Sequence, residues 1–299
     1  GLASNLAGLG VGLGGRVRYG ADLREVRGSL HLPAALTGGG VTGSVFRTEE
    51  DIPADDYEIQ RIQTGFQIQQ SIGRPSRLEV LLGYRFRRNL TIAPTLPEIP
   101  IDVGGLDVSF LRTTQDDLLD PRRGAFWSLN LNVAPSWLGS DAPLLTGYAQ
   151  TVLNRSFRED SLTWAQSYRL GLAWGLDGEP VIATERFKAG GASSLRGFGT
   201  NEVGPRGFFG DPIGGESVVI MNQELRYHHR TGLGLVGFYD VGNVFPTVDS
   251  MRVDFRHTLG AGLRWASPIG LLRLDLGLPL DREPEEKGYQ LFFGLGQAF

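Results

Sequence analysis

The residue best suited to specific chemistry is one arginine in a glycine-rich stretch, Arg196 in "GGASSLRGFG" at 190–199. A guanidinium group can donate two parallel hydrogen bonds to one carboxylate, which a lysine ammonium cannot do. Gly197, and Gly190 with Gly191, would let the backbone turn tightly and approach another surface closely. The chemistry that this stretch suggests is ion pairing that holds a loop in place. A solvated arginine at the tip of a surface loop is the alternative.

Candidate partners of this arginine occur at alternate positions of segments that have the pattern of β-strands. In "GFYDVGNVF", Asp240 shares one face with Phe238 and Gly242. Further polar residues alternate in "MNQELRY" and "LLRLDLGLPL": Asn222, Glu224, Arg226, Arg273 and Asp275. For this second group, a layer around Arg196 and a generic polar lining remain open alternatives.

No group of residues in the sequence indicates catalysis or metal binding. The acidic run "QDDLLD", Gln115 to Asp120, lacks the ligand spacing of an EF-hand and is typical of a solvated turn. In "GVGLGG" at 10–15 the glycines alternate within a strand pattern and no helix follows, which argues against a nucleotide loop. The chain has no G-x-S-x-G elbow, and its four histidines show no metal spacing. We therefore expect no enzyme, no cofactor and no metal, and an outer-membrane lipase would need a Ser–His arrangement that these strands do not offer.

The elements that must position these residues are β-strands, because apolar and polar residues alternate along most of the chain. In "LLRLDLGLPL", the leucines from Leu272 to Leu280 fall on one face, and Arg273, Asp275 and Gly277 fall on the other. Fourteen segments are predicted to be antiparallel strands: 8–20, 25–36, 40–49, 57–71, 77–91, 102–114, 124–136, 144–157, 162–175, 216–228, 233–244, 256–267, 270–280 and 289–299. Many are longer than the roughly five to six residues that are usual for strands.

The composition fits an all-β transmembrane barrel. The chain has 299 residues, 43 of them glycine, no cysteine, a net charge of −4 and no basic tract of the kind that binds nucleic acid. It has no run of 18 apolar residues, and the opening "GLASNLAGLG" lacks the basic start of a signal peptide. Aromatic residues lie near both ends of "WAQSYRLGLAW". Short connections such as "GRPS" and "SFREDS" alternate with long ones such as "TIAPTLPEIPI" and 178–216, as in outer-membrane barrels with an even number of strands.

In such a barrel the leucine-rich faces of the strands meet lipid and the polar faces line the interior. Leu274 and Leu276 are central in their strand. We therefore expect arginine at Leu274 to be far more damaging than serine at Gly277 on the opposite face.

Four segments together resemble the family of outer-membrane assembly and secretion barrels, the BamA, TamA and two-partner-secretion transporter group. "FKAGGASSLRGFG" is similar to the family's loop motif, an aliphatic-Arg-Gly-aromatic box, here Leu195, Arg196, Gly197 and Phe198. "GFYDVGNVF" is similar to the family's strand with an inward aspartate, here Asp240. "GAGLRWASPIGLLRLDLGLPL" resembles the penultimate hairpin, and "TTQDDLLDPRRG" resembles the mid-barrel periplasmic turn.

The end of the chain fits this resemblance less closely. Gly294 and Phe299 match the family's C-terminal strand signal, whereas Phe292 and Gln297 depart from it. The family has sixteen strands preceded by periplasmic helper domains, the POTRA modules. Its long loop follows the eleventh strand, but only nine predicted strands precede the loop here. The resemblance thus implies that residues 1–299 are a C-terminal barrel domain, and that the first two strands and all helper domains lie outside this chain.

The resemblance also implies a position for the long extracellular loop 178–216. A similar loop folds back into the barrel, where its arginine pairs with inward carboxylates. We therefore expect Arg196, Gly197 and Phe198 to anchor the loop inside the barrel on Asp240. Glu224 and Asp275 are expected to be the next nearest carboxylates.

The function that the resemblance implies is assembly, insertion or translocation of proteins at the bacterial outer membrane. The mechanism would open a lateral seam between the first and last strands, where unpaired backbone groups can accept a client strand. The expected partners are outer-membrane lipid, an unfolded barrel client or secreted protein, and periplasmic or accessory lipoproteins, but not nucleic acid. The alternative is a passive pore or a surface-binding outer-membrane barrel.

Overall fold

The computed structural model describes residues 2–6, 10–20, 22–33, 40–53, 58–72, 78–92, 100–158, 160–208, 210–268, 270–284 and 286–299. The chain divides into two compact units. Unit 1 comprises Gly1–Arg112, Leu129–Gly147 and Trp174–Thr184, and unit 2 comprises Thr113–Ser128, Tyr148–Ala173 and Glu185–Phe299.

Unit 1 contains seven strands in antiparallel hairpin order. They are β1 (Leu2–Leu6), β2 (Val11–Tyr19), β3 (Leu23–Leu32), β4 (Val41–Pro53), β5 (Glu58–Ile72), β6 (Leu78–Ile92) and β7 (Pro100–Thr113). Each strand from β1 to β6 pairs with the next one along the chain. Long alternating sequences produce these long strands because successive side chains leave the backbone on opposite faces.

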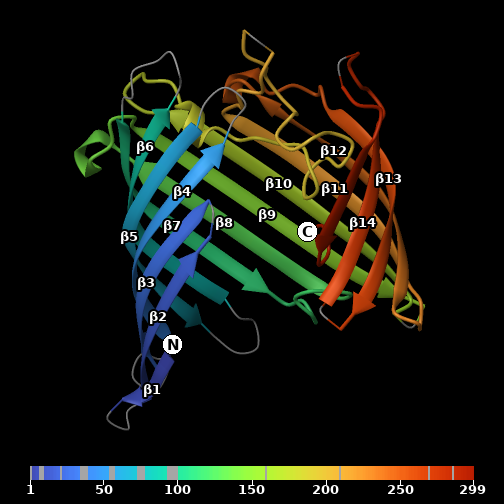
Figure 1. Ribbon diagram of the computed structural model, residues 1–299, viewed down its shortest axis with the longest axis horizontal. Coiled ribbons are helices and arrows are strands. Elements are labelled where there is room, and N and C mark those ends of the chain that lie inside the picture. The colour runs from blue at the N-terminus through green and yellow to red at the C-terminus, as the bar shows by residue number, and fades with distance from the viewer. Residues whose placement is uncertain are drawn as a thin grey trace. The chain divides into compact units, whose positions relative to one another are not determined.

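Three further strands, β8 (Gly124–Ala134), β9 (Leu144–Phe157) and β10 (Leu162–Gly175), contribute residues to both units. Unit 2 continues with β11 (Ser217–His228), β12 (Leu233–Phe245), β13 (Arg256–Ser267), β14 (Gly270–Pro279) and β15 (Gln290–Leu295). The order of strands in the sheet follows the chain from β1 to β15 (Figure 1).

Helix is confined to three short 3-10 turns among the described residues: η1 (Ser136–Leu138), η2 (Ala183–Glu185) and η3 (Val248–Ser250). None of the helical segments in the described ranges has the length and apolar character needed to cross a membrane. The prediction of an all-β antiparallel fold is confirmed.

The fourteen predicted strands correspond one to one to β2–β15, and both ends of β9, β10 and β13 agree with the prediction. The sequence analysis did not predict β1. The short connection "GRPS" and most of "TIAPTLPEIPI" lie outside the described residues.

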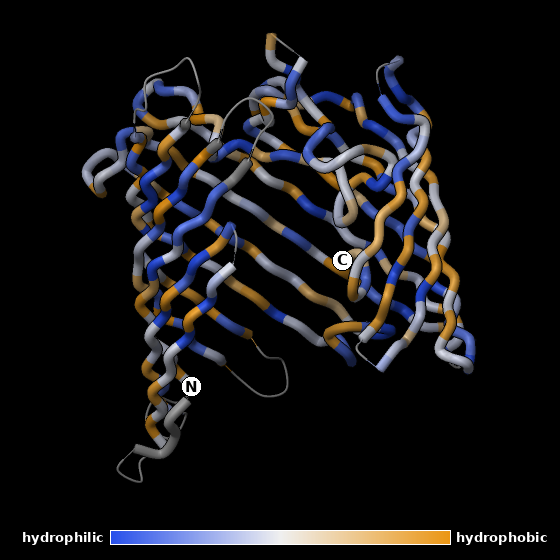
Figure 2. The backbone as a smooth tube through the Cα atoms, viewed as in Figure 1, coloured by the Kyte–Doolittle hydropathy of each residue, from blue (hydrophilic) through white to orange (hydrophobic). Residues whose placement is uncertain are grey.

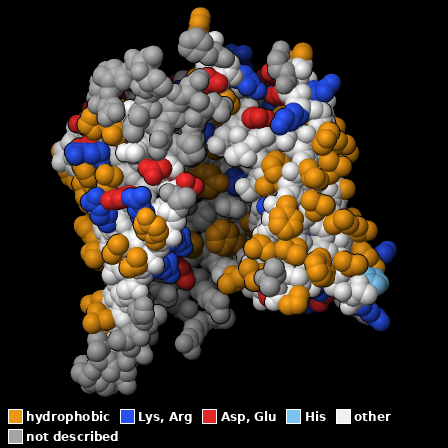
Figure 3. All heavy atoms as spheres, viewed as in Figure 1, with side chains coloured by type: hydrophobic (Ala, Val, Ile, Leu, Met, Phe, Trp, Pro, Cys, Tyr) orange, Lys and Arg blue, Asp and Glu red, His pale blue; other side chains and the backbone are white. Residues whose placement is uncertain are grey.

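The strands of unit 2 have two chemically different faces. We call the face that carries Asp240 the inner face, and its residues are buried. The opposite, outer face exposes large apolar side chains on four neighbouring strands. Hydrophobic residues recur along the backbone of β13 and β14 in Figure 2, and Figure 3 shows apolar side chains gathered over the same part of the molecule. They include Leu225, Tyr227, Leu233, Leu235, Leu259, Leu263, Trp265, Leu274, Leu276 and Leu278. An apolar surface of this extent is unusual on a water-soluble monomer and fits contact with lipid.

The last strand is shorter than predicted, since β15 ends at Leu295 instead of continuing to the chain end. Gly296 has a φ of +78°, a left-handed conformation that turns the backbone out of the strand. The side chain of Gln297 then accepts a hydrogen bond from Arg264 Nε (3.1 Å) and donates one to Asp120 (2.7 Å). Of the two residues assigned to the strand signal, Gly294 therefore lies in β15, and Phe299 lies beyond it under the Arg226 guanidinium.

Candidate functional site

The register of β11–β14 gathers the polar residues of the inner face into adjoining rows. Asn222, Asp240 and Thr258 are direct neighbours across three strands. In the next row Glu224 lies beside Phe238, followed by Gly260 and Gly277. In the row after that, Arg226 and Asp275 share a level with the small residue Gly262. Side chains from separate parts of the sequence thus converge on one small area.

The loop between β10 and β11 reaches this area through a tight turn. Gly190 and Gly191 have φ values of +106° and +97°, which side chains beyond glycine rarely adopt. The amide of Gly191 donates to the carbonyls of Leu195 (3.3 Å) and Phe198 (3.1 Å). These bonds close a turn from Gly191 to Phe198, and Arg196 lies within that turn.

Arg196 is completely buried and meets three carboxylates. Its Nε and Nη2 donate to the two oxygens of Asp240 at 2.9 and 2.7 Å, and its own amide also donates to Asp240 at 3.1 Å. Its Nη1 donates to Glu224 and lies 3.5 Å from Asp275 Oδ2. The guanidinium also lies over the Phe238 ring, 3.5 Å from its centroid.

These contacts fix the charge of Arg196. Burial alone would lower its pKa, but Glu224, Asp240 and Asp275 together raise the pKa above the ordinary arginine value. The group is permanently cationic, so the site works as a fixed ion-pair clamp and not as a proton donor.

Further arginines balance the carboxylates from the other side. Arg226 Nε donates to Glu224 at 2.7 Å, and Arg264 donates through two nitrogens to Asp275. A carboxylate that is buried with a single partner is costly, and each of these has at least two.

A second set of side chains holds the loop backbone next to Arg196. Asn222 Nδ2 donates to the carbonyl of Ser194 (2.6 Å) as well as to Asp240 (2.7 Å). Arg169 donates to the Ser193 carbonyl (2.7 Å), and Arg273 donates to the Ala192 carbonyl (3.1 Å). Three consecutive carbonyls of the loop are therefore bound by side chains of the sheet.

Glycines of the inner face make room for this loop. A Cβ atom added at Gly277 would overlap the backbone carbonyl of Arg196, and one added at Gly260 would overlap the Phe238 ring. Gly197 is equally confined, because a Cβ there would lie 2.6 Å from Thr258 Oγ1. The structure gives no support to the expectation that serine at Gly277 costs far less than arginine at Leu274, because the loop backbone lies directly against Gly277.

Apolar residues on either side of the arginine complete the contact. Leu195 and Phe198 are buried in a cluster with Val203, Val218 and Val244. Burial of a leucine and a phenylalanine side chain contributes about 1.5–3 kcal/mol each. The ion pairs thus fix one position for a loop that apolar packing also stabilises.

The turn between β7 and β8 is tied by its own aspartates and joined to Arg264 through Gln297. Asp116 accepts hydrogen bonds from the amides of Asp117, Arg122 and Arg123 at 3.0–3.1 Å. Asp117 accepts from the amides of Leu119 (2.7 Å) and Asp120 (2.9 Å). The carboxylates of Asp116 and Asp117 are thus used within the turn, and Asp120 accepts the bond from Gln297. No metal-binding cluster occurs in the part of the chain that the structure describes.

We expect this turn to loosen at low pH. Hydrogen bonds from the amides of Asp120 and Leu119 lower the pKa of Asp117. The ionised Asp117 therefore stabilises the turn fully above its unfolded-state pKa of about 4, and this stabilisation is lost as pH falls through the lower folded-state pKa. Asp117→Ala should speed hydrogen exchange of those amides about fivefold at neutral pH, the equivalent of roughly 1 kcal/mol. Unchanged exchange would contradict the assignment, and Asp249→Ala serves as a control elsewhere.

The structure thus brings Arg196, Asp240, Glu224 and Asp275 into direct contact, and it places Asn222, Arg226 and Arg273 around them. Three further residues of this group were not singled out from the sequence: Arg169, Thr258 and Arg264. Phe238 was placed on the face of Asp240 but without its contact to Arg196. All four alternate onto the inner face, which was the available signal.

Comparison with known proteins gives a family match over nearly the whole chain. The model of the Omp85 superfamily domain matches residues 5–299. The outer membrane protein assembly factor BamA of Nitratidesulfovibrio vulgaris is 35% identical over 126 residues, which is 40% of this chain and 16% of that protein. A SAM50-like protein of Schizosaccharomyces pombe is 26% identical over all of this chain and 68% of its own length.

Solved structures of low sequence identity share the fold. BamA from Haemophilus ducreyi lacking POTRA domains 1–3 aligns with a TM-score of 0.81 at 20% identity, over 99% of this chain and 66% of that one. CdiB from Acinetobacter baumannii aligns with a TM-score of 0.62 at 16% identity, over 98% of this chain and 54% of that one. The chain therefore spans only part of the length of these proteins.

Proposed function

This chain belongs to the Omp85 superfamily, and from that membership we propose that it assembles or translocates proteins at the bacterial outer membrane. The observation that carries the proposal is the loop whose Arg196 is bound by three carboxylates on the inner face of a sheet with an apolar outer face. The names of its relatives support it: outer membrane protein assembly factors among the curated proteins and CdiB among the structures.

We infer that the sheet closes into a barrel in the full protein and that closure leaves a weak seam. β1 and β15 are the first and last strands in the sheet order, and β15 has only six residues. A short terminal strand offers few backbone hydrogen bonds, so its edge is available to a client strand. Backbone groups in lipid must be satisfied, and a client strand that pairs at the seam satisfies both its own groups and those of the edge.

In this mechanism the loop around Arg196, Gly197 and Phe198 is an internal anchor, not a catalyst. It occupies the inner face beside β11–β14 and fixes the strands that lead to the seam. Asp240 is the principal acceptor, Glu224 and Asp275 are the flanking acceptors, and Asn222, Arg226 and Arg273 form the surrounding layer.

The partners that we propose are outer-membrane lipid, an unfolded barrel client or secreted protein, and periplasmic or accessory lipoproteins. We propose that POTRA domains, which the H. ducreyi BamA also has, would deliver the client to this barrel.

The experiment that tests this proposal uses the full-length protein in liposomes. We expect it to accelerate the folding of an added barrel client, measured as the appearance of the heat-resistant folded form. Folding no faster than in empty liposomes, together with steady ion conductance in planar bilayers, would favour the alternative of a passive pore.

The outer face supplies a separate prediction about membrane contact. Leu274→Arg should cost about 2–4 kcal/mol of unfolding free energy in bilayers if this position is near the midplane. Leu280→Arg, beyond the end of β14, is the matched control and should cost far less. Urea unfolding in lipid vesicles measures both, and equal losses would mean that this face does not meet the hydrocarbon.

A further inference from the structure

The outer face of β10 and β11 carries a polar pair within its apolar surface. Gln166 and Gln223 are direct partners in the register of these strands. The neighbouring outer-face residues are Trp164 and Tyr168 on β10 and Met221 and Leu225 on β11. Amide side chains are unexpected at the centre of a lipid-facing surface, so this pair requires an explanation.

Hydrogen bonds join the pair to the aromatic residues beside it. Trp164 Nε1 donates to Gln223 Oε1 (3.0 Å), Gln223 Nε2 donates to the Tyr168 hydroxyl (3.3 Å), and that hydroxyl donates to Gln166 Oε1 (3.2 Å). The chain of bonds ends at Gln166. Its Nε2 has no hydrogen-bond partner among the residues that the structure describes.

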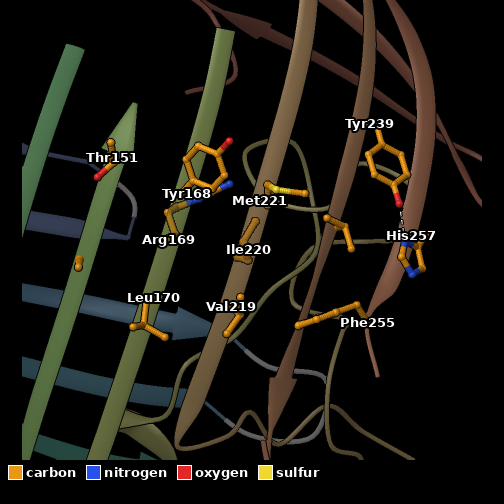
Figure 4. A pocket seen from close by; sticks show the side chains of 12 residues that line it. Thr151, Tyr168, Arg169, Leu170, Val219, Ile220, Met221, Tyr239, Phe255 and His257 are labelled. Carbon is orange, nitrogen blue, oxygen red and sulfur yellow. Dashed lines mark hydrogen bonds between the residues drawn. The ribbon is translucent and has the colours of Figure 1, made fainter. Parts of the chain in front are cut away.

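Two apolar grooves flank the pair along the strands. One, of about 650 Å³, lies on the side of Tyr168 and Met221 and extends to Tyr239 and His257, which Figure 4 shows hydrogen-bonded to each other. The other, of about 520 Å³, lies on the side of Leu225. The amides therefore lie within the apolar surface and not at its edge.

The amides lie well inside the outer-face run of β11. Its residues are Val219, Met221, Gln223, Leu225 and Tyr227, so about 13 Å of strand separates Gln223 from either end of this run. Hydrocarbon offers no acceptor to an amide. With this face in the membrane, as the proposed function requires, another polypeptide can supply the acceptor.

We propose that this patch, Trp164, Gln166, Tyr168 and Gln223 with the two grooves, is the contact surface for a second copy of the same chain. Each amide offers a donor and an acceptor side by side, so the pair can bond to its own copy about a two-fold axis. Trp164 and Tyr168 protrude, with 44% and 40% of their surface exposed, next to grooves that can receive the same rings of the other copy.

The charge of the patch also permits contact between identical surfaces. The histidine that lines the first groove, His257, is already bonded to the Tyr239 hydroxyl at 2.6 Å. Glutamine side chains bond across contacts between membrane-embedded segments, which supports association there. The proposal shares with the proposed function the premise that this face lies in the membrane, and it adds a partner that assembly of a client does not require.

Cysteine cross-linking tests the contact, because the chain contains no cysteine. Gln223→Cys in the full-length protein, oxidised in its native membrane, should give a disulfide-linked dimer. Leu278→Cys is the matched control, since it lies in the same row on the outer face of β14, three strands away. In a two-fold contact centred on the glutamines, the two copies of position 278 are too far apart to cross-link.

A second variant keeps the test independent of folding. The double variant Gln166→Leu and Gln223→Leu should remain folded and heat-resistant in gels, while its dimer dissociation constant in nanodiscs, from native mass spectrometry, rises about three- to thirtyfold. Any one of four results would overturn the proposal. They are equal cross-linking at positions 223 and 278, cross-linking to a different protein, a protein that stays monomeric whether or not lipid is retained, and an unchanged dissociation constant. Client folding by the monomer would persist in every case, so the proposed function would stand.

Discussion

Arg196→Ala should be the most damaging single substitution at the inner face, with a loss of about 3–5 kcal/mol in unfolding free energy. It removes the shared partner of three carboxylates. The buried Asp240 keeps its hydrogen bonds from Asn222 and from the backbone amide of residue 196 but loses the guanidinium that balances its charge. Asp240→Ala should cost less than Arg196→Ala, because Arg196 would keep Glu224 and Asp275.

The double variant tests whether the two residues act as a pair. We expect Arg196→Ala with Asp240→Ala to cost less than the sum of the single changes, with a coupling of about 1–3 kcal/mol. Unfolding in urea in lipid vesicles measures all three variants. Arg123→Ala is the matched control, since it breaks a solvent-exposed pair with Asp160, which should contribute little because water screens it. Strict additivity would contradict the anchor.

Gly277→Val should release the loop without removing any charge. Its Cβ would occupy the position of the Arg196 carbonyl, so either the loop or β14 must move. Overpacking of this kind typically costs about 1–3 kcal/mol. We expect a protease to cut the loop near Arg206 at least about tenfold faster than in the unchanged protein, the equivalent of about 1.4 kcal/mol of easier opening.

The control for this change is Gly237→Val on β12, two strands away from β14 in the sheet. A Cβ at Gly237 meets no atom within 4 Å. The loop of that variant should resist the protease as the unchanged protein does. Equal cutting of the two variants would mean that Gly277 does not seat the loop.

The strand pattern was predictable because alternation is a local property. The outer-face leucines of β14 and the polar residues between them set its two faces directly. The strand β1 was not predicted, because its five residues, "LASNL", show no clear alternation of apolar and polar side chains. The end of β15 could not be foreseen, because Gly296 turns the chain and Gln297 bonds to Arg264 and Asp120, which are distant in the sequence.

The candidate site was predictable in part for the same reason. Alternation places Asp240, Glu224 and Asp275 on the inner face, and the glycine-rich stretch marks Arg196, but alternation does not say which inner residues the loop reaches. Arg169 and Arg264 depend on the register of neighbouring strands and on the path of the loop. Gly277 belongs to the site because the loop backbone lies against it, and alternation alone does not reveal that contact.

Client folding in liposomes shows whether the anchored loop serves assembly, when its rate is compared between the full-length protein and three variants. We expect Arg196→Ala and Gly277→Val, which release the loop in different ways, to slow client folding, while Gly237→Val folds clients as fast as the unchanged protein does. Unimpaired client folding by Arg196→Ala and Gly277→Val, with the loop open to protease in both, would contradict the claim that the anchored loop serves assembly.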